Sequence, residues 1–367
     1  MTDRLIAVYA VRADVAGVDA RAEALALEQS VELPLAAVFD ARVRREIVAR
    51  VESIAARADG RHTVRVALAR ETTGDEPGQL LNMLFGNSSL HDDVELVDIE
   101  IDAALASAYG GPRHGVRGWR EATGALDRPL TCSALKPQGL GPDALADLAG
   151  VYARAGIDVV KDDHGLANPP SAPYAARVPA VQAAIDDANR ATGGRTVYAP
   201  NLTGSLDAIR AQLRVARDCG ARAALIAPMV SGVASLAVVA REAGVPILAH
   251  PALAGLGRMA PPLLCGRLFR LFGADATIYP YAGGRFGYSA STCAAIASAA
   301  RDPWAGLAPA LPVPAGGMSV ERVPEVARAV GPDAMLLIGG SLLAAGAGLE
   351  ARCRAFVTAV HAAGAPR

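Results

Sequence analysis

The stretch GIDVVKDDHGLANPP, residues 156–170, decides how the rest of the chain is interpreted. Three aliphatic residues run straight into four polar ones without a turn residue between them: Ile157, Val159, Val160, then Lys161, Asp162, Asp163 and His164. A short apolar run that ends abruptly in polar residues is typical of a buried parallel strand whose C-terminal end opens into a loop. The stretch predicts such a strand, with either a metal site at its end or a plain solvent-exposed end.

Seven other runs of the same kind occur from about Gly118 onward, one before this stretch and six after it. With the first stretch they make eight: PLTCSALKP, IDVVKDDHG, TVYAPNLTG, ALIAPMVSG, PILAHPALAG, ATIYPYAGG, ALPVPAGG and AMLLIGGS. Segments between them, such as GPDALADLAGVYARAG, carry apolar residues at helical spacing and end in glycine. Eight strand–helix units predict a (β/α)₈ TIM barrel over residues 121–367. A doubly wound sheet is the alternative, but no GxGxxG follows the first strand.

Residues 1–120 have a different pattern. Strand patterns occur at LIAVYAV, HTVRVALAR and DVELVDIEI, and helical patterns at DARAEALALEQS and PGQLLNMLFG. This order predicts an N-terminal α+β domain of ferredoxin-like type, with helices packed on one face of the sheet. GGPRHGVRG is the expected passage into the barrel.

Composition excludes several classes of protein. The 36 Lys and Arg residues nearly balance the 37 Asp and Glu residues, so no overall charge attracts nucleic acid or an anionic membrane. Five cysteines without CxxC spacing argue against a disulfide framework or a zinc knuckle. No apolar run reaches about 18 residues, and the first residues lack a long apolar segment. A cytoplasmic enzyme is expected.

Active sites of such barrels lie at the C-terminal ends of the strands, so polar residues there are candidates for function. The first strand offers Lys136 and Gln138 in ALKPQGL, and the fifth offers His250 in LAHPALAG. His250 is a candidate general acid or base. A lysine that reaches the barrel rim and a structural histidine are the alternatives.

The second strand end suggests a metal, and two glycine pairs suggest a phosphate. Mg²⁺ prefers several oxygen ligands, and Lys161 becomes one only if CO₂ converts it to a carbamate. A salt-bridged strand end is the alternative. The seventh and eighth strands end in PAGG and IGGS, where main-chain N–H groups of glycines approach anions easily. Phosphate binding is predicted at Gly316, Gly317, Gly339 and Gly340, with tight turns as the alternative.

Taken in order, these strand-end motifs resemble those of the RuBisCO large-subunit superfamily. The resemblance covers nearly the whole chain and includes LLNMLFGN and YGGPRHGVRG ahead of the barrel. It implies that Lys161 is carbamylated and binds Mg²⁺ with Asp163 and His164, while Lys136 handles protons at an enolate and His250 is the fifth-strand active-site histidine. It also implies that Asn87 is supplied by a neighbouring subunit, in a homodimer with shared active sites.

The departures from that family's carboxylases point away from CO₂ fixation. Carboxylases have glutamate at His164, lysine at Gln138 and arginine at Pro251, and the loop YAGGRFGYS has Arg285 but none of the lysine that carboxylases place there. The family's N-terminal catalytic glutamate corresponds to Arg70 or Glu71, depending on a one-residue gap. The chain therefore resembles a RuBisCO-like protein of form IV, with Asn87, Gln138 and Arg285 as candidate substrate-binding residues.

Three functions are compatible with these residues. The leading prediction is a lyase that decarboxylates a phosphorylated β-keto sugar acid such as 3-oxo-isoapionate 4-phosphate through a metal-stabilised enediolate. The alternative is an isomerase or enolase of the methionine-salvage type, acting on a relative of 5-methylthioribulose phosphate. The third is a binding protein that kept the barrel and lost the metal.

Overall fold

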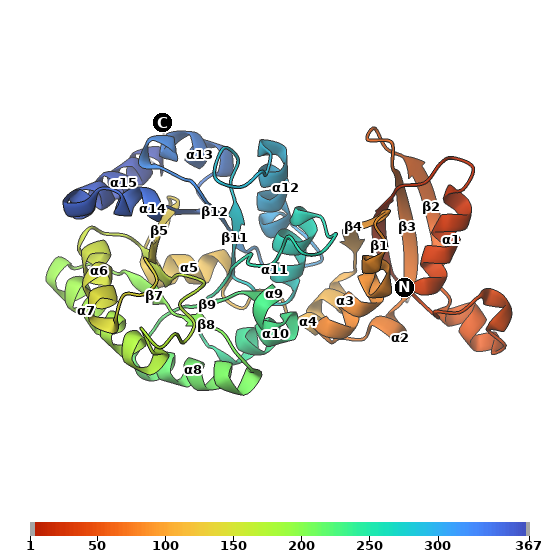
Figure 1. Cartoon of the computed structure of the whole chain (residues 1–367), viewed down its shortest axis with the longest axis horizontal. Helices are drawn as coiled ribbons and strands as arrows, with labels where there is room; N and C mark the ends of the chain where they lie inside the picture. The colour runs from red at the N-terminus through yellow and green to blue at the C-terminus, as the bar shows by residue number, and fades with distance from the viewer. Residues whose placement is uncertain (1–3, 365–367) are drawn as a thin grey trace. The chain divides into compact units, whose positions relative to one another are not determined.

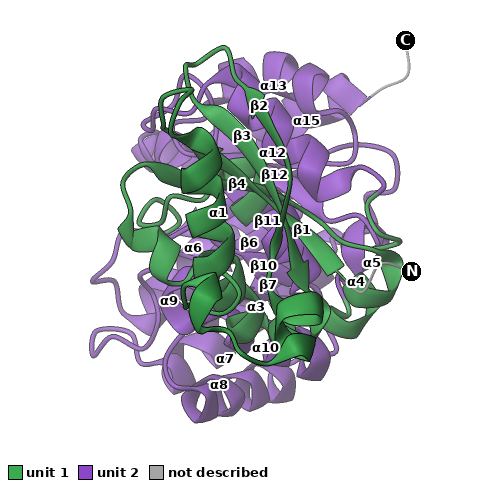
Figure 2. Cartoon of the chain, turned by 90° about the vertical axis from the view of Figure 1, so that its right-hand side faces the viewer, with its two compact units in different colours: residues 1–110, 254–264, 304–307 green, residues 111–253, 265–303, 308–367 purple. Residues whose placement is uncertain are grey.

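The computed structural model describes residues 4–364, and contacts within the chain divide it into two compact units (Figure 2). The first comprises Met1–Gly110, Ala254–Leu264 and Trp304–Leu307, and the second comprises the remaining segments, Gly111–Leu253, Cys265–Pro303 and Ala308–Arg367. The two-domain division at residues 120 and 121 stays a prediction. Within residues 4–364, no helix is long and apolar enough to cross a membrane.

The first unit is built on a four-stranded antiparallel sheet with the order β2-β3-β1-β4. Its main elements are β1 (Arg4–Val11), α1 (Val18–Glu28), β2 (Arg50–Ala56), β3 (His62–Ala69), α3 (Pro77–Phe85) and β4 (Val94–Glu100). This βαββαβ order confirms the predicted ferredoxin-like domain. The sequence pattern misses β2 because this edge strand is mostly exposed and lacks apolar alternation.

The second unit contains all eight predicted barrel strands. They are β5 (Leu130–Leu135), β6 (Val159–Asp162), β7 (Val197–Ala199) continuing as β8 (Asn201–Leu202), β9 (Ala224–Ile226), β10 (Ile247–Ala249), β11 (Ala276–Pro280), β12 (Leu311–Ala315) and β13 (Met335–Leu337). Parallel pairing links β13-β5-β6-β7 and β12-β11-β10-β9-β8, and β12 lies beside β13. Pro200 interrupts the third strand, because proline has no N–H for the ladder. The predicted (β/α)₈ barrel is confirmed.

Helices surround the barrel strands, as Figure 1 shows. The longer ones are α6 (Pro142–Arg154), α7 (Tyr174–Thr192), α8 (Leu206–Asp218), α10 (Val233–Glu242), α12 (Ala290–Arg301), α13 (Val323–Val330) and α15 (Leu349–Gly364). The Ser205 hydroxyl caps α8 by accepting from the Ala208 N–H, so this helix begins one residue after a typical N-cap residue.

Short elements complete the chain. The short helices are α2 (Arg70–Thr73), α4 (Ala103–Tyr109), α5 (Gly115–Thr123), α9 (Pro228–Ser231), α11 (Phe269–Leu271) and α14 (Gly340–Leu343). The 3₁₀ and π turns are η1 (Leu35–Ala37), η2 (Val43–Ile47), η3 (Asn87–Leu90), η4 (Pro262–Leu268), η5 (Val320–Arg322) and η6 (Gly346–Gly348).

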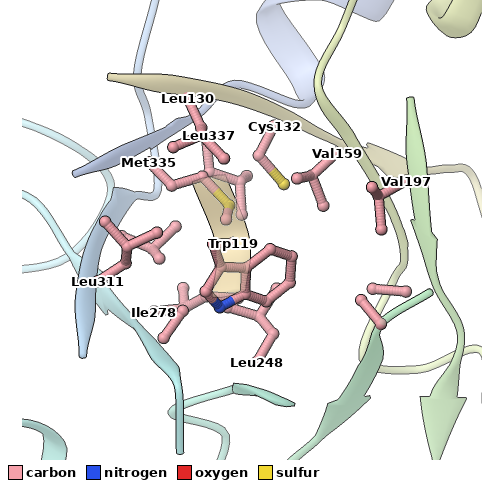
Figure 3. Packing of buried hydrophobic residues seen from close by; sticks show 14 of the residues in the cluster. Trp119, Leu130, Cys132, Val159, Val197, Leu248, Ile278, Leu311, Met335 and Leu337 are labelled. Carbon is pink, nitrogen blue, oxygen red and sulfur yellow. The ribbon is translucent and has the colours of Figure 1, made fainter. Parts of the chain in front are cut away.

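The barrel interior is a packed apolar core, not a channel. Trp119 of α5 is fully buried and lies among inward side chains of the strands, as Figure 3 shows. Leu130 and Cys132 of β5 and Val159 of β6 belong to this core. Side chains alternate along a strand, so every second residue faces the barrel interior. Toward the C-terminal ends of β5, β6 and β10 these inward positions are occupied by polar residues. The core thereby defines which side chains face the candidate site.

Candidate active site

Strand alternation brings the predicted catalytic residues to one end of the barrel. On β5 the inward series that begins at Leu130 continues to Lys136, and on β6 the series from Val159 continues to Lys161 and Asp163. On β10 it runs from Leu248 to His250. All these residues lie at or just beyond the C-terminal ends of their strands. This is the end at which (β/α)₈ barrels carry their active sites.

Asp163 joins two of these residues. Lys136 Nζ lies 2.7 Å from Asp163 Oδ2, and His164 Nδ1 lies 3.3 Å from Asp163 Oδ1. Burial acts to raise the pKa of Asp163, but the hydrogen bond from His164 and the charges of Lys161 and Lys136 outweigh it and leave the pKa below its usual range. Asp163 is therefore a carboxylate at any working pH.

His250 is held as a neutral ring with a defined tautomer. Its ring stacks on that of His164, with centroids 4.3 Å apart and planes 12° apart. Burial, reinforced by the charges of Lys161 and His164, lowers its pKa to about 2. The Ala252 N–H donates to His250 Nδ1 at 3.1 Å, so the ring hydrogen is on Nε2. His250 thus presents an N–H donor rather than a base.

Lys161 is almost fully buried. Its Nζ donates to the main-chain oxygen of Asp162 at 2.9 Å. Burial lowers its pKa below the ordinary lysine value, although the charge of Asp163 acts in the opposite direction. A lysine with a lowered pKa is more often the neutral amine, which is the form that reacts as a nucleophile.

Asp162 faces away from this group and has a structural role. Its carboxylate accepts from Arg177 Nη2 at 3.1 Å, from the Tyr198 hydroxyl at 2.7 Å and from the Asn201 main-chain N–H at 2.9 Å. Arg177 and Asp162 are both fully buried. The two neighbouring aspartates of KDDHG therefore have different contacts: Asp162 holds the strand end in place, and Asp163 bonds Lys136 and His164 at the candidate site.

Gln138 lies against the turn of the KDDHG segment. A Cβ atom placed on Gly165 would fall 1.5 Å from Gln138 Nε2, so only glycine leaves room for this amide. The loop after β5 and the turn after β6 are therefore packed directly on each other. This places Gln138, a predicted substrate-binding residue, beside the Lys136 and Asp163 strand ends.

The glycine pairs also lie at this end, in adjacent loops. The Ser341 hydroxyl donates to the Met318 main-chain oxygen at 2.9 Å, which joins the loops that contain the two pairs. Gly316 and Gly317 have φ angles of 81° and 89°, a region that favours glycine. A Cβ on Gly339 would lie 3.9 Å from Lys136 Cε. Gly339 therefore lies beside Lys136, and the loops that contain the two glycine pairs contact each other. Phosphate binding by these glycines stays a prediction.

Arg285 is in the loop after β11, which packs on the first glycine pair. Its main-chain N–H donates to the Gly316 oxygen at 3.2 Å, and its guanidinium lies 5.4 Å from the centre of the Phe286 ring. The Arg285 side chain is exposed. Asn87 belongs to the first compact unit, where its Nδ2 donates to Glu28 Oε1 at 2.9 Å. The predicted role of each residue stays a prediction.

The donor set fits a divalent cation only if Lys161 is modified. Among residues 4–364, no three His, Cys, Asp or Glu side chains gather in a way that would hold a metal ion. Asp163 offers carboxylate oxygens, and the Nε2 of His164 is not engaged by Asp163. A carbamate on Lys161 would add a second oxygen donor group to these two. Carbamylation of Lys161 and Mg²⁺ binding by Lys161, Asp163 and His164 stay predictions.

Sequence reasoning missed Asn201. Its side chain is buried, and its Nδ2 donates to the His164 main-chain oxygen at 2.9 Å. The available signal was alternation: Val197 and Ala199 face the barrel core, so Asn201 is the next inward position. The preceding Pro200 makes the stretch resemble a turn. Asn201 is thus an additional polar residue at the strand ends.

The fold and the site define a class of proteins in which a (β/α)₈ barrel follows a ferredoxin-like domain in the sequence, with lysines, a carboxylate and stacked histidines at the strand ends. Comparisons with known proteins agree. The family model described as ribulose bisphosphate carboxylase large chain, catalytic domain, matches residues 115–261. A crystal structure of a Rubisco-like protein from Rhodopseudomonas palustris superposes with a TM-score of 0.94 at 49% identity, covering 100% of both chains.

Two curated relatives extend the similarity to named activities. The 5-methylthioribulose-1-phosphate isomerase of Rhodospirillum rubrum is 53% identical over 365 residues, 99% of this chain and 98% of that protein. The 2,3-diketo-5-methylthiopentyl-1-phosphate enolase of Geobacillus thermodenitrificans is 33% identical over 84% of this chain and 76% of that protein. The chain belongs to the RuBisCO large-chain family, as its strand-end motifs predicted, and close relatives are RuBisCO-like proteins.

Proposed function

We propose that the chain is an isomerase of a phosphorylated methylthio-ketose, of the 5-methylthioribulose 1-phosphate type, and that it works through an enediolate. The observation that carries the proposal concerns lysine. The chain has two lysines, Lys136 and Lys161, and both lie beside Asp163 at the same end of the barrel. The remaining members of the 36 Lys and Arg residues are arginines. Arginine neither exchanges protons near neutral pH nor forms a carbamate readily.

The chemistry starts from the acidity of C–H bonds beside a ketone. When one of these protons is removed, its electron pair moves to the carbonyl oxygen and an enediolate forms. Returning a proton to the other carbon of the enediolate moves the carbonyl along the chain. Lys136 is the proposed proton carrier, as a neutral amine in the first half and an ammonium in the second. The Nε2–H of His250 donates to the oxygen on which negative charge develops.

A divalent cation completes the proposal. Mg²⁺ would be held by the carbamate of Lys161 together with Asp163 and His164, and it would supply Lewis-acid stabilisation of the negative oxygen. Lys161 and Asp163 are buried in place before any substrate binds. The protein thereby orients its own oxygen donors and excludes water from them.

One phosphate accounts for the anion-holding groups. Gly316, Gly317, Gly339 and Gly340 are proposed to receive it through main-chain N–H groups. Gln138 and Arg285 are proposed substrate contacts. Pro251 occupies the position at which carboxylases of the family have arginine, so a substrate with a single phosphate suits this chain better than a bisphosphate.

The leading sequence-based prediction, decarboxylation of a phosphorylated β-keto sugar acid, is not confirmed. Loss of CO₂ from such an acid produces the same kind of enediolate, so the residues alone are compatible with both reactions. The activities for which the two curated relatives are named favour the alternative that the sequence also left open. We therefore propose isomerisation as the function of this chain, with decarboxylation as the second candidate.

A two-substrate assay distinguishes these reactions. The full-length protein, supplied with Mg²⁺ and bicarbonate, is incubated with 5-methylthioribulose 1-phosphate and, separately, with 3-oxo-isoapionate 4-phosphate. Carbon NMR follows the first and CO₂ release follows the second. We expect an isomer that keeps every carbon of the first substrate and no CO₂ from the second. Release of CO₂ without isomerisation would replace the proposal with the decarboxylase.

We also propose that the chain works as a homodimer in which Asn87 of one copy completes the site of the other. The support is the family resemblance of the FGN motif. Within its own unit, Asn87 bonds Glu28, a contact that a carboxylate ligand or substrate hydroxyl is able to replace.

A further inference from the structure

Asn201 makes a set of contacts that neither the family motifs nor the proposed chemistry explains. Its main-chain N–H donates to Asp162 Oδ2, and its side-chain Nδ2 donates to the His164 oxygen, each at 2.9 Å. One residue of the third barrel strand therefore holds both sides of the segment that contains Asp163. Its side chain is only 1% exposed.

The orientation of the Asn201 amide follows from its partner. The His164 main-chain oxygen can only accept hydrogen bonds, so the amide NH₂ must face it. The amide oxygen, Oδ1, then faces the other way. Within residues 4–364, Oδ1 is buried and has no hydrogen-bond partner. An orphaned buried acceptor is costly, and a native site normally supplies a donor for it.

Strand register indicates which donor is near. The parallel ladder pairs Lys161 of β6 with Ala199 of β7, and Asn201 is the next inward residue beyond Ala199. Beyond this pair, the Asn201 N–H bonds the Asp162 side chain, while the Asp162 main-chain oxygen accepts from Lys161 Nζ. Lys161 and Asn201 therefore converge on the two sides of Asp162.

We propose that Asn201 is a positioning residue for Lys161: its amide oxygen accepts an N–H of the Lys161 amine or carbamate, while its NH₂ fixes the turn that carries Asp163. The inference rests on the proposed function, because it concerns the same lysine. In carbamylation the amine nitrogen attacks the carbon of CO₂, an electron pair moves to one oxygen, and one nitrogen-bound proton leaves to solvent. The remaining N–H then has the Asn201 amide oxygen as its acceptor.

The test measures the carbamate itself, not turnover. The full-length protein is titrated with ¹³C-bicarbonate in the presence of Mg²⁺, and the carbamate carbon is followed by NMR. Lys161→Ala assigns the signal. Asn201→Ala removes the observed bond to the His164 oxygen and the proposed bond to Lys161, whereas Asn201→Asp keeps the size and replaces the amide by a carboxylate that holds Lys161 protonated. We expect each Asn201 variant to need about tenfold or more bicarbonate for half-carbamylation.

Asn189 provides a matched control. Its Nδ2 donates to the Thr196 oxygen and its Oδ1 accepts from the Thr196 N–H, so it fastens the opposite end of the same strand. Asn189→Ala should carbamylate within twofold of the wild-type protein. Circular dichroism confirms that each variant is folded, and Asn201→Asp serves if Asn201→Ala is not.

Wild-type carbamylation by folded Asn201 variants would overturn the inference, as would a wild-type protein without a signal that depends on Lys161. These failures differ from failure of the proposed function. If the protein isomerises the substrate but gives no carbamate signal, the isomerase proposal stands and the inference about Asn201 is wrong. If the carbamate depends on Asn201 but the protein leaves the methylthio-ketose unchanged, the inference stands and the proposed function is wrong.

Discussion

Asp163 is the residue through which the charged groups of the site are linked. Lys136 bonds one of its oxygens and His164 the other, and Lys161 contributes charge from within the same strand. Without substrate, the ammonium of Lys136 is therefore held by a carboxylate instead of moving freely on its flexible stem. This arrangement makes Lys136 the residue whose loss should affect chemistry more than binding.

We expect Lys136→Met to lower kcat by about 10²- to 10⁴-fold with little change in KM, because methionine fills the space but carries no proton. Steady-state kinetics with the methylthio-ketose phosphate measures this. Gln138→Met, which removes a proposed substrate contact from the same loop, should instead raise KM with little change in kcat. A drop confined to KM would show that Lys136 binds substrate and does not carry the proton.

His250 should control part of the acid sensitivity of the fold. In the unfolded chain it takes up a proton near its ordinary pKa of 6.5, but in the folded protein only at about 2. Below about pH 6.5 the unfolded state binds the extra proton, so this residue makes the folded state less stable as the pH falls. His250→Gln should lose less stability than the wild type between pH 7 and pH 5.

Urea unfolding at both pH values checks this prediction. His91→Gln, at an exposed position of the first unit, is the control and should behave as the wild type does. An equal loss of stability in His250→Gln and the wild-type protein would contradict a neutral His250.

At the scale of elements, the loops after β11 and β12 are built around close backbone contacts. A Cβ on Gly317 would lie 2.7 Å from Gly284 Cα and 2.9 Å from the Arg285 nitrogen. The turn that is proposed to receive phosphate therefore also positions the loop that contains Arg285. Glycine is required here by both its φ angle and the space around it.

Gly317→Ala should raise KM for the phosphorylated substrate, because the new methyl group displaces the loop or the turn. Gly244→Ala isolates the conformational part of this effect. Gly244 also has a positive φ angle, 68°, but nothing lies within 4 Å of its added Cβ. Gly244→Ala should lose about 1–2 kcal/mol of unfolding free energy for its φ angle alone. Gly317→Ala should lose more because of the added clash, and only Gly317→Ala should change KM. Equal KM values would place the phosphate elsewhere.

The elements themselves were largely predictable from the sequence, for a physical reason. Every barrel strand is buried on both faces, so each appears as a short apolar run with an abrupt polar end. The exposed edge strand β2 lacks that pattern, and α5 has few apolar residues by which to recognise it. Lys161, Asp163 and His250 were predictable because they follow such runs directly. The contacts of Asn201 depend on the register between strands, which the sequence does not display.

At the scale of the whole molecule, the site requires residues from strands far apart in the sequence. Lys161 lies in β6, and Lys136 and His250 directly follow β5 and β10; the three meet because the barrel closes. The proposed homodimer extends the same dependence to a second copy, through Asn87 of the first compact unit. In a shared site, a defect in one copy can be compensated by an intact residue of the other copy.

Two inactive variants should restore activity when mixed, if the sites are shared. Asn87→Ala and Lys161→Ala, each inactive alone, are mixed under conditions that exchange subunits. The hybrid then has one site with both residues intact. Light scattering checks that the species is a dimer, and native mass spectrometry of the mixture, with one variant labelled with ¹⁵N, checks that hybrid dimers form. A mixture that stays inactive despite exchange would show that each copy forms its own complete site.

The central claim is that this barrel forms an enediolate by breaking a C–H bond beside a ketone, and isotopic labelling of that bond tests it most directly. 5-Methylthioribulose 1-phosphate deuterated on both carbons next to the carbonyl is given to the wild-type protein and to Lys161→Ala, with Mg²⁺ and bicarbonate. The account predicts that the wild-type protein removes deuterium from one of these carbons, or turns the labelled substrate over more slowly, while Lys161→Ala does neither. Product that retains every deuterium with no slowing, or full activity in Lys161→Ala, would contradict it.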